Sequence, residues 1–274
     1  MKIRMLVENT SIRPDVVPAH GISLYIEILK KKILFDMGPA GLFRQNAKAL
    51  GLDLAAVDLA VISHGHADHG GGLADFLQVN RRAKIYLQES AFGEYFSRRE
   101  TGLSRIGLDR SLRAREQIVL LSGDRALSEH MQLFSKVSMQ EFQPEDNKNL
   151  LKKQAGEYRP DDFCHEQNLL LQESGKLFLF AGCAHRGIWN ILLSAGARMG
   201  RYPDVVVSGF HFYSRSRRKM ESMEHMDALA DFLRSLRAKF YTCHCTGQEP
   251  FCRLEEKLGK RMEYLSAGQT IEIQ

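Results

Sequence analysis

One short stretch of the sequence limits the fold more than any other feature, because it places a cluster of metal-binding side chains directly after a strand. Residues 57–62 (VDLAVI) are almost entirely apolar, which is typical of a buried β-strand. They run straight into SHGHADHGGGL, which contains His64, His66, Asp68 and His69 within six residues. Glycines interrupt the regular pattern there, and a helix is predicted to begin at LADFL. The cluster therefore lies at the end of a buried strand.

The spacing within this cluster predicts a metal site. Side chains two residues apart in an extended chain point to the same side, so His64 and His66 can bind one metal ion. Asp68 and His69 follow where the chain turns, and they can face a second ion ~3.5–4 Å from the first. Imidazole and carboxylate ligands suit zinc, iron or manganese. A polar loop before a helix is the simpler alternative, but three histidines at this spacing favour metal binding.

Several other histidines and one cysteine also lie beside predicted strand ends, where catalytic metal sites collect ligands. They are His165, Cys183, His185, His211 and His244. We predict His165, His185 and His244 as further metal ligands, and Cys183 as a ligand or a neighbour of one. Each of these side chains could instead bond a backbone carbonyl at its strand end.

The remaining pattern predicts blocks of strands separated by helices. Strands are expected at 22–29, 32–36, 84–88, 117–121, 131–137, 168–173, 176–182, 204–208 and 239–244, and helices at 40–50, 187–199 and 224–237. This order is not a strict βα alternation, so two sheets with helices packed outside fit better than a doubly wound parallel sheet. Residues 93–116 are polar, basic and weakly patterned, and we interpret them as an insertion near a rim.

Length and composition are those of a globular protein. The chain has 274 residues, of which 44% are hydrophobic and 26% charged, so it can bury a large core without disulfides. No apolar run approaches the ~20 residues that a membrane span needs. The N-terminal stretch MKIRMLVENT has too short an apolar core for a signal peptide, so we expect a cytoplasmic protein without a membrane partner.

The five cysteines are an odd number without an export signal, which favours reduced thiols or metal ligands over disulfides. Cys243, Cys245 and Cys252 lack the paired spacing and the fourth ligand of a structural zinc site, so we expect buried thiols beside the active site. The chain also has no Walker loop, G-x-G-x-x-G or G-x-S-x-G motif. These absences argue against nucleotide phosphate cradles, dinucleotide binding and a serine hydrolase.

The charge balance is mildly basic. Lys and Arg number 38 and Asp and Glu 33, a net charge of +5 that permits an anionic substrate without requiring nucleic acid. A basic run follows the sequence GFH directly and comprises Arg215, Arg217, Arg218 and Lys219. It is either a solvated loop or a substrate-binding rim that attracts phosphate.

Several motifs together resemble the metallo-β-lactamase superfamily. HGHADH matches its signature His-x-His-x-Asp-His, and HGISLYIE, KILFDMG, LAVISHGHADHGGGL, DDFCHEQNLL, FAGCAHRGIWNI, SGFHF and HCTG follow in order along nearly the whole chain. The set resembles the branch that contains the archaeal dihydropteroate synthase-related proteins. The resemblance implies a single α/β (α+β) domain over residues 1–274, a four-layer αββα sandwich of two mixed β-sheets with helices on the outer faces.

The resemblance also implies roles for single residues. His64, His66, Asp68 and His69 match the signature, and His165 and His244 match later metal ligands. Cys183 stands where most members have a bridging Asp, so its thiolate could bridge or bind one metal, or the role could pass to His185. His211 belongs to the branch pattern and can face the substrate instead of a metal.

Three functions remain open at this stage. The first is a metallo-hydrolase, in which two divalent ions, zinc first and iron or manganese otherwise, activate a water that Asp68 orients. There His211 would donate a hydrogen bond or proton to a small anionic substrate that bears phosphate. The second, implied by the branch, is a pterin-linked transferase that condenses a dihydropterin pyrophosphate with an aromatic amine and releases pyrophosphate.

The third function is nucleic-acid processing or binding, which we do not expect because few aromatic residues interleave with the basic run. The resemblance adds that members which cut nucleic acid usually carry an extra domain, for which this chain has no room. Residues 93–116 are expected to cover the site or to join two copies of the chain into a homodimer.

Overall fold

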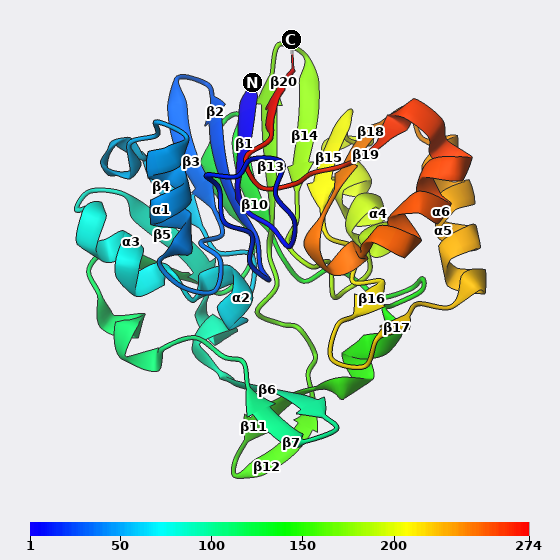
Figure 1. Cartoon of the computed structure of the whole chain (residues 1–274), viewed down its shortest axis with the longest axis horizontal. Helices are drawn as coiled ribbons and strands as arrows, with labels where there is room; N and C mark the ends of the chain where they lie inside the picture. Colours follow the sequence, from blue (N-terminus) through cyan, green and yellow to red (C-terminus); the bar gives the residue numbers. More distant parts are fainter. Residues whose placement is uncertain (274) are drawn as a thin grey trace. The chain divides into compact units, whose positions relative to one another are not determined.

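A computed structural model describes residues 1–273, which form two compact units. The first unit comprises Met1–Tyr95, Arg105–Gly123 and the segment that starts at Leu265. The second comprises Phe96–Ser104 and Asp124–Tyr264. Each unit contains one seven-stranded sheet and its own helices (Figure 1). The mixed α/β class and the two mixed sheets predicted from the sequence are therefore confirmed.

The sheet of the first unit has an antiparallel and a parallel half. Its strands, in spatial order, are β20 (Thr270–Glu272), β1 (Lys2–Val7), β2 (Ser23–Ile28), β3 (Lys31–Phe35), β4 (Leu59–Val61), β5 (Lys84–Gln88) and β8 (Ile118–Leu121). Neighbours from β20 to β3 are antiparallel, and those from β3 to β8 are parallel. Parallel neighbours need crossover connections. These connections contain α1 (Leu42–Ala49), α2 (Ala67–Gly70) and α3 (Leu73–Val79).

Helices α1 and α3 share one apolar core with this sheet. Phe43 of α1 and Phe76 of α3 belong to the same buried cluster as Leu34, Ala60 and Ile85 of the parallel strands. All five side chains are fully buried. The near-continuous apolar sequence of these strands follows from burial on both faces of the sheet.

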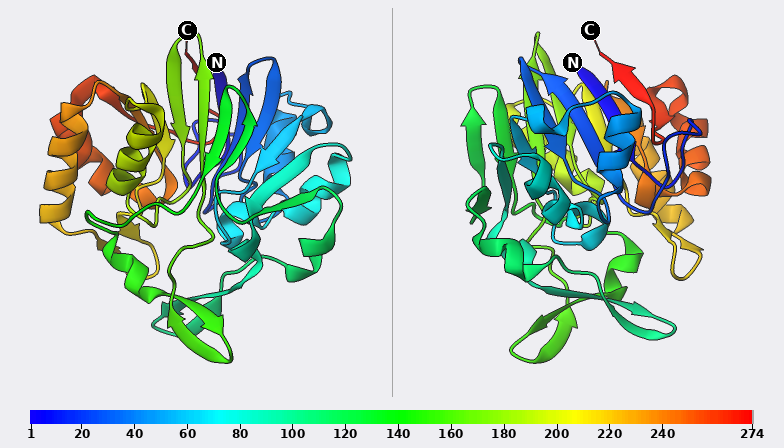
Figure 2. Two further views of the ribbon diagram at one scale, coloured as in Figure 1. Left: turned by 180° about the vertical axis from the view of Figure 1, so that it is seen from behind. Right: turned by 60° about the vertical axis from the view of Figure 1, so that its left-hand side comes forward.

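The sheet of the second unit repeats this division into two halves. Its strands, in spatial order, are β19 (Met262–Tyr264), β18 (Lys239–Thr242), β15 (Val205–Ser208), β14 (Lys176–Phe180), β13 (Asn168–Glu173), β10 (Met131–Phe134) and β9 (Arg125–Ser128). Neighbours from β14 to β19 are parallel, and those from β9 to β14 are antiparallel. Helices α4 (Ile188–Met199), α5 (Met223–Ser235) and α6 (Gln248–Leu258) lie beside this sheet (Figures 1 and 2).

Helix α5 illustrates why these helices form and where they pack. The Ser222 side chain caps its first turn by accepting a hydrogen bond from the His225 N–H. Met226, Leu229 and Leu233 follow at helical spacing and are buried in the core of the second unit. The predicted helix over 224–237 is confirmed within one or two residues at each end.

Residues 93–116 contain more regular structure than their weak pattern suggested. They include β6 (Glu94–Arg99) and β7 (Gly102–Arg105), which join β11 (Leu150–Gln154) and β12 (Glu157–Pro160) in a four-stranded sheet (Figures 1 and 2). Most residues of β7 and β12 are exposed, so neither strand shows the alternation that marks a half-buried strand. The last short sheet pairs β16 (Tyr213–Ser214) with β17 (Lys219–Met220).

Most of the predicted elements are present with shifted ends, and the sequence analysis missed several others. The missed elements include β1, β9, β11, β19, β20 and α6. Within residues 1–273, no helix combines the length and the apolar character needed to span a membrane.

Candidate metal centre

The histidine cluster of the first unit lies at the carboxyl-terminal edge of its parallel strands. Strands β3 and β4 are parallel neighbours, so they end at the same edge of the sheet. Asp36 directly follows β3, and Ser63 and His64 follow β4. The Asp36 N–H donates to the Val61 carbonyl at 2.9 Å, which extends the strand pairing up to the cluster.

Three of the predicted ligands converge at this edge. The ligand atoms of His64, His66 and Asp68 all lie within 4.8 Å of one another. The two imidazoles are buried, and their ring centroids are 4.6 Å apart. The Asp68 side chain keeps 25% of its surface exposed. Two imidazoles and a partly solvated carboxylate are a donor set that suits a divalent metal.

His69, the fourth residue of the predicted cluster, lies beside His64 with ring centroids 4.2 Å apart. Its Nδ1 is 2.6 Å from Asp36 Oδ2, and the Nδ1 of His64 is 2.9 Å from Ser63 Oγ. A polar partner at Nδ1 fixes the ring and its tautomer and directs Nε2 toward a metal. The residues of this edge therefore fit a metal held through imidazole Nε2 atoms.

Asp36 orients this cluster, and the sequence analysis assigned it no role. Its Oδ1 accepts from the Ser63 N–H and its Oδ2 from the Ser63 hydroxyl, both at 2.7 Å. Asp36 is fully buried and has a φ of 58°, in the left-handed region that few non-glycine residues adopt. The only signal in the sequence was its place directly after a predicted strand, in KILFDMG.

In the second unit, three adjacent parallel strands end at one edge of the sheet. Cys183 lies three residues beyond the end of β14, His211 three beyond the end of β15, and Cys245 three beyond the end of β18. Their ligand atoms all lie within 4.8 Å of one another. The sequence patterns predict site roles for Cys183 and His211, but for Cys245 only a buried thiol.

His165 and His185 are both buried, and a polar side chain holds one ring nitrogen of each. The Nε2 of His165 is 3.0 Å from Asp161 Oδ2, and the Nδ1 of His185 is 3.0 Å from Asn147 Oδ1. The His185 ring stacks on Phe163 with centroids 4.6 Å apart and planes inclined by 5°. These contacts hold the rings rigidly, as they must be held in metal ligands.

The loops that carry these residues are anchored by buried groups. Glu166 accepts hydrogen bonds from the His185 N–H at 2.6 Å and from the Arg186 N–H at 3.1 Å. Burial raises the pKa of Glu166, and the two backbone N–H groups partly oppose that rise. His244 is buried at the start of a short 3₁₀ helix, His244–Thr246, which begins two residues beyond the end of β18.

The Cys245 thiol has a strongly shifted acidity. Burial raises its pKa, but hydrogen bonds with Cys183 and His211 and the charges of His244 and His211 lower it well below the ordinary value of 9.0. None of the five cysteines of the chain, all within the described residues, forms a disulfide. Cys243 and Cys245 are buried as expected, whereas Cys252 is exposed, which corrects the expectation that all three of these thiols are buried. Cys183 is buried as well.

The basic run that follows His211 divides into two pairs. Arg217 and Lys219 line a cavity of about 70 Å³ together with His211 and Ser214, whereas Arg215 and Arg218 are not among its lining residues. Ser214 is 5% exposed, and its hydroxyl has no hydrogen-bond partner in the described part of the chain. The structure thus connects only half of the run to a cavity.

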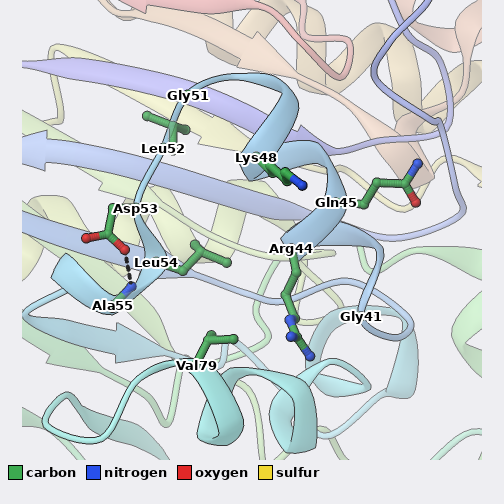
Figure 3. Close-up of a pocket in the computed structure, with 10 residues that line it drawn as sticks. All are labelled: Gly41, Arg44, Gln45, Lys48, Gly51, Leu52, Asp53, Leu54, Ala55 and Val79. Carbon is green, nitrogen blue, oxygen red and sulfur yellow. Dashed lines mark hydrogen bonds between the residues drawn. The ribbon is translucent and has the colours of Figure 1, made fainter.

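A larger hollow in the first unit lies away from this chemistry. Its volume is about 770 Å³, and its lining includes Arg44 and Lys48 of α1 together with Leu52 and Val79 (Figure 3). None of the predicted metal ligands lines it. Asp53 at its edge caps a short 3₁₀ turn by accepting from the Ala55 N–H, which accounts for that carboxylate (Figure 3).

Comparison with known proteins agrees with the fold. The family model of the metallo-β-lactamase superfamily matches residues 20–151. The crystal structure of Tm1679, described as a metal-dependent hydrolase of the β-lactamase superfamily, superposes with a TM-score of 0.83 at 26% identity and covers 100% of this chain and 99% of that one. The chain therefore has the fold of the metallo-β-lactamase superfamily and is similar in sequence to its members.

Two relatives come from the archaeon Methanocaldococcus jannaschii. The uncharacterized protein MJ0448 is 26% identical over 93% of this chain and 94% of its own length. The second, 7,8-dihydropterin-6-methyl-4-(beta-D-ribofuranosyl)-aminobenzene-5'-phosphate synthase, is 27% identical over 93% of this chain and 90% of its own length. The chain is therefore similar in sequence to a pterin-related archaeal enzyme.

We predict that Asp36→Asn weakens metal binding about 10- to 100-fold, because an amide cannot accept at both oxygens from Ser63 and His69. Asn tolerates the left-handed backbone of this position, so the variant should keep its fold. Competition with a chromophoric chelator measures the affinity. Asp15→Asn, at an exposed ion pair with Arg13, is the matched control and should bind metal normally. Equal metal affinities of the two variants would show that Asp36 does not support metal binding.

Proposed function

We propose that the protein is a metal-dependent hydrolase of a small anionic substrate that bears phosphate. The observation that carries this proposal is the convergence of His64, His66 and Asp68, with the neighbouring ring nitrogens held by Asp36 and Ser63. A divalent metal bound by these residues would supply Lewis acidity and would lower the pKa of water in the site. The superfamily match extends the proposed ligand set to His69, His165, His185 and His244, with zinc as the expected ion.

Asp68 is the proposed residue that orients the attacking water. Its carboxylate is partly exposed, and its Oδ2 lies 3.6 Å from the Nε2 of His20 and 3.8 Å from the Nε2 of His69. A carboxylate between imidazoles and solvent can accept a hydrogen bond from water while one oxygen remains for a metal. Asp68 therefore combines binding and orientation in one side chain.

The cavity beside His211 supports an anionic group on the substrate. Its volume of about 70 Å³ is roughly five times the ~10–15 Å³ that one water requires, which is enough for a phosphate group. Arg217 has no ion pair or hydrogen-bond partner within residues 1–273, so its guanidinium can bind a phosphate oxygen. The Ser214 hydroxyl and the His211 ring line the same cavity and can donate further hydrogen bonds.

Three carboxylates line this cavity, and each already has a polar partner. Asp146 Oδ1 accepts a hydrogen bond from the Asn149 side-chain amide at 2.7 Å. Glu145 Oε2 lies 3.2 Å from the Lys219 ammonium and 3.7 Å from that of Lys148. Glu221 lies 3.6 Å from His225 and accepts from the Glu145 N–H. Arg217 is therefore the cation whose charge is left for a ligand.

A pterin-linked transferase is the second candidate, favoured by the 27% identity to the archaeal synthase over nearly the full chain. In that reaction a metal cation held by the same residues would neutralise a departing pyrophosphate. The phosphate-binding cavity would serve a phosphorylated aromatic amine equally well, so the two candidates share the anion site and differ in the bond that forms.

We predict that His66→Ala lowers the turnover of a generic phosphodiester or phosphomonoester at least 100-fold, because it removes a ligand from the metal. His130→Ala is the matched control, since His130 is exposed in a loop and should retain full activity. Steady-state assays of purified protein with supplied zinc measure both variants. Full activity of His66→Ala would contradict a metal-dependent hydrolase.

We predict that Arg217→Ala raises KM for a phosphate-bearing substrate about tenfold and leaves kcat within a factor of two, because it removes a binding contact. Arg215→Ala removes the same charge from the same exposed run but from outside the cavity, so its KM should stay unchanged. Similar effects of both variants would indicate general electrostatic attraction. If neither variant changes KM, the basic run does not bind the anionic group of the substrate.

Incubation with a dihydropterin pyrophosphate and a phosphorylated aromatic amine distinguishes the two candidate functions. A transferase forms a product with a new C–N bond and releases pyrophosphate, which mass spectrometry detects. The hydrolase proposal predicts at most release of phosphate without a joined product. A joined product that disappears in His66→Ala would replace the hydrolase by the transferase.

A further inference from the structure

We propose that Cys183, His211 and Cys245 form a thiolate metal site that selects zinc over manganese and magnesium. This thiolate site goes beyond the proposed hydrolase, because no sequence motif predicted a metal-binding role for Cys245. Its ligands would be two thiolates and one imidazole. The proposal concerns the second unit alone and holds for either candidate reaction.

The topology of the sheet creates this group of residues. Strands β14, β15 and β18 are consecutive parallel neighbours. Cys183, His211 and Cys245 each lie three positions beyond the last residue of their strand. Because the chain runs on equally far past the end of each of these neighbouring strands, the three side chains come together. The edge is held by hydrogen bonds between the extensions, in which Gly209 N–H donates to the Gly182 carbonyl at 2.8 Å.

The backbone around the thiols is shaped for close approach. A Cβ atom at Gly209 would lie 2.5 Å from the sulfur of Cys245, so only glycine leaves room for that sulfur. His211 follows with a φ of 54°, in the left-handed region that non-glycine residues rarely adopt. Such backbone strain persists where the surroundings hold it and gathers at functional sites.

The distances suit a shared ion. With Zn–S bonds of ~2.3 Å, two sulfurs of a tetrahedral site lie about 3.8 Å apart. The three ligand atoms lie within 4.8 Å of one another, so shifts on the order of 1 Å would bring them into coordination. Burial of both cysteines keeps bulk water away from two thiolates, which a metal cation would neutralise.

The donor set determines which metal fits. Thiolates select zinc and other thiophilic ions, whereas manganese and magnesium prefer oxygen ligands. Three protein ligands are also the number found in zinc sites that keep a fourth position for water or substrate. His211 lines the 70 Å³ cavity as well, so its ring links this site to the proposed phosphate group.

Cobalt substitution of the full-length protein tests the proposal, because cobalt bound to thiolate absorbs strongly in the near ultraviolet. Protein stripped of metal and given two equivalents of Co²⁺ should show this absorption. Cys245→Ser and Cys183→Ser should each lose at least half of it. Cys252→Ser, at an exposed position of α6, is the control and should retain it all.

Three outcomes would overturn the site. The first is that the wild type shows no thiolate absorption. The second is that Cys183→Ser loses the absorption while Cys245→Ser keeps it. The third is that mass spectrometry finds a Cys183–Cys245 disulfide in the metal-loaded protein. Zinc K-edge X-ray absorption of the wild type keeps the test valid if a variant fails to fold. Sulfur scattering near ~2.3 Å is expected, and a shell of nitrogen and oxygen only would contradict the proposal.

Discussion

The arrangement of the candidate site residues depends on one constraint, the termination of neighbouring parallel strands at a common sheet edge. In the first unit, β3 and β4 place Asp36 and the histidine cluster side by side. In the second unit, β14, β15 and β18 do the same for Cys183, His211 and Cys245. Strands buried on both faces cannot shift register without exposing apolar side chains, so the core fixes these functional side chains in place.

Buried polar contacts then determine how the side chains point. Asp36 binds His69 and Ser63, Asp161 binds His165, and Asn147 binds His185. Each contact satisfies a buried polar atom that would otherwise destabilise the fold. The same contact sets the tautomer of an imidazole, so the stability and the proposed metal affinity depend on the same hydrogen bonds. Arg217 of the basic run has no such contact within the described residues and can respond to a ligand.

The sequence predicted those features that depend on the spacing of residues close together in the chain. His64, His66, Asp68 and His69 are adjacent in the chain, and the helices and most central strands have clear periodicity. Asp36 and Ser63 are 27 residues apart, and Cys183 and Cys245 are 62 apart, so their proximity depends on strand order that no local pattern shows. Helix α6 was missed because QEPFCRLEEKL is largely polar and has Pro250 in its first turn, where proline is tolerated.

Metal content measured together with turnover tests the central claim most directly. Elemental analysis of protein purified without added metal, with phosphate ester turnover before and after chelation, gives both quantities on one sample. The account predicts about two metal ions per chain, zinc foremost, and turnover that chelation abolishes and zinc restores. A metal-free protein whose turnover is unaffected by chelation would contradict it.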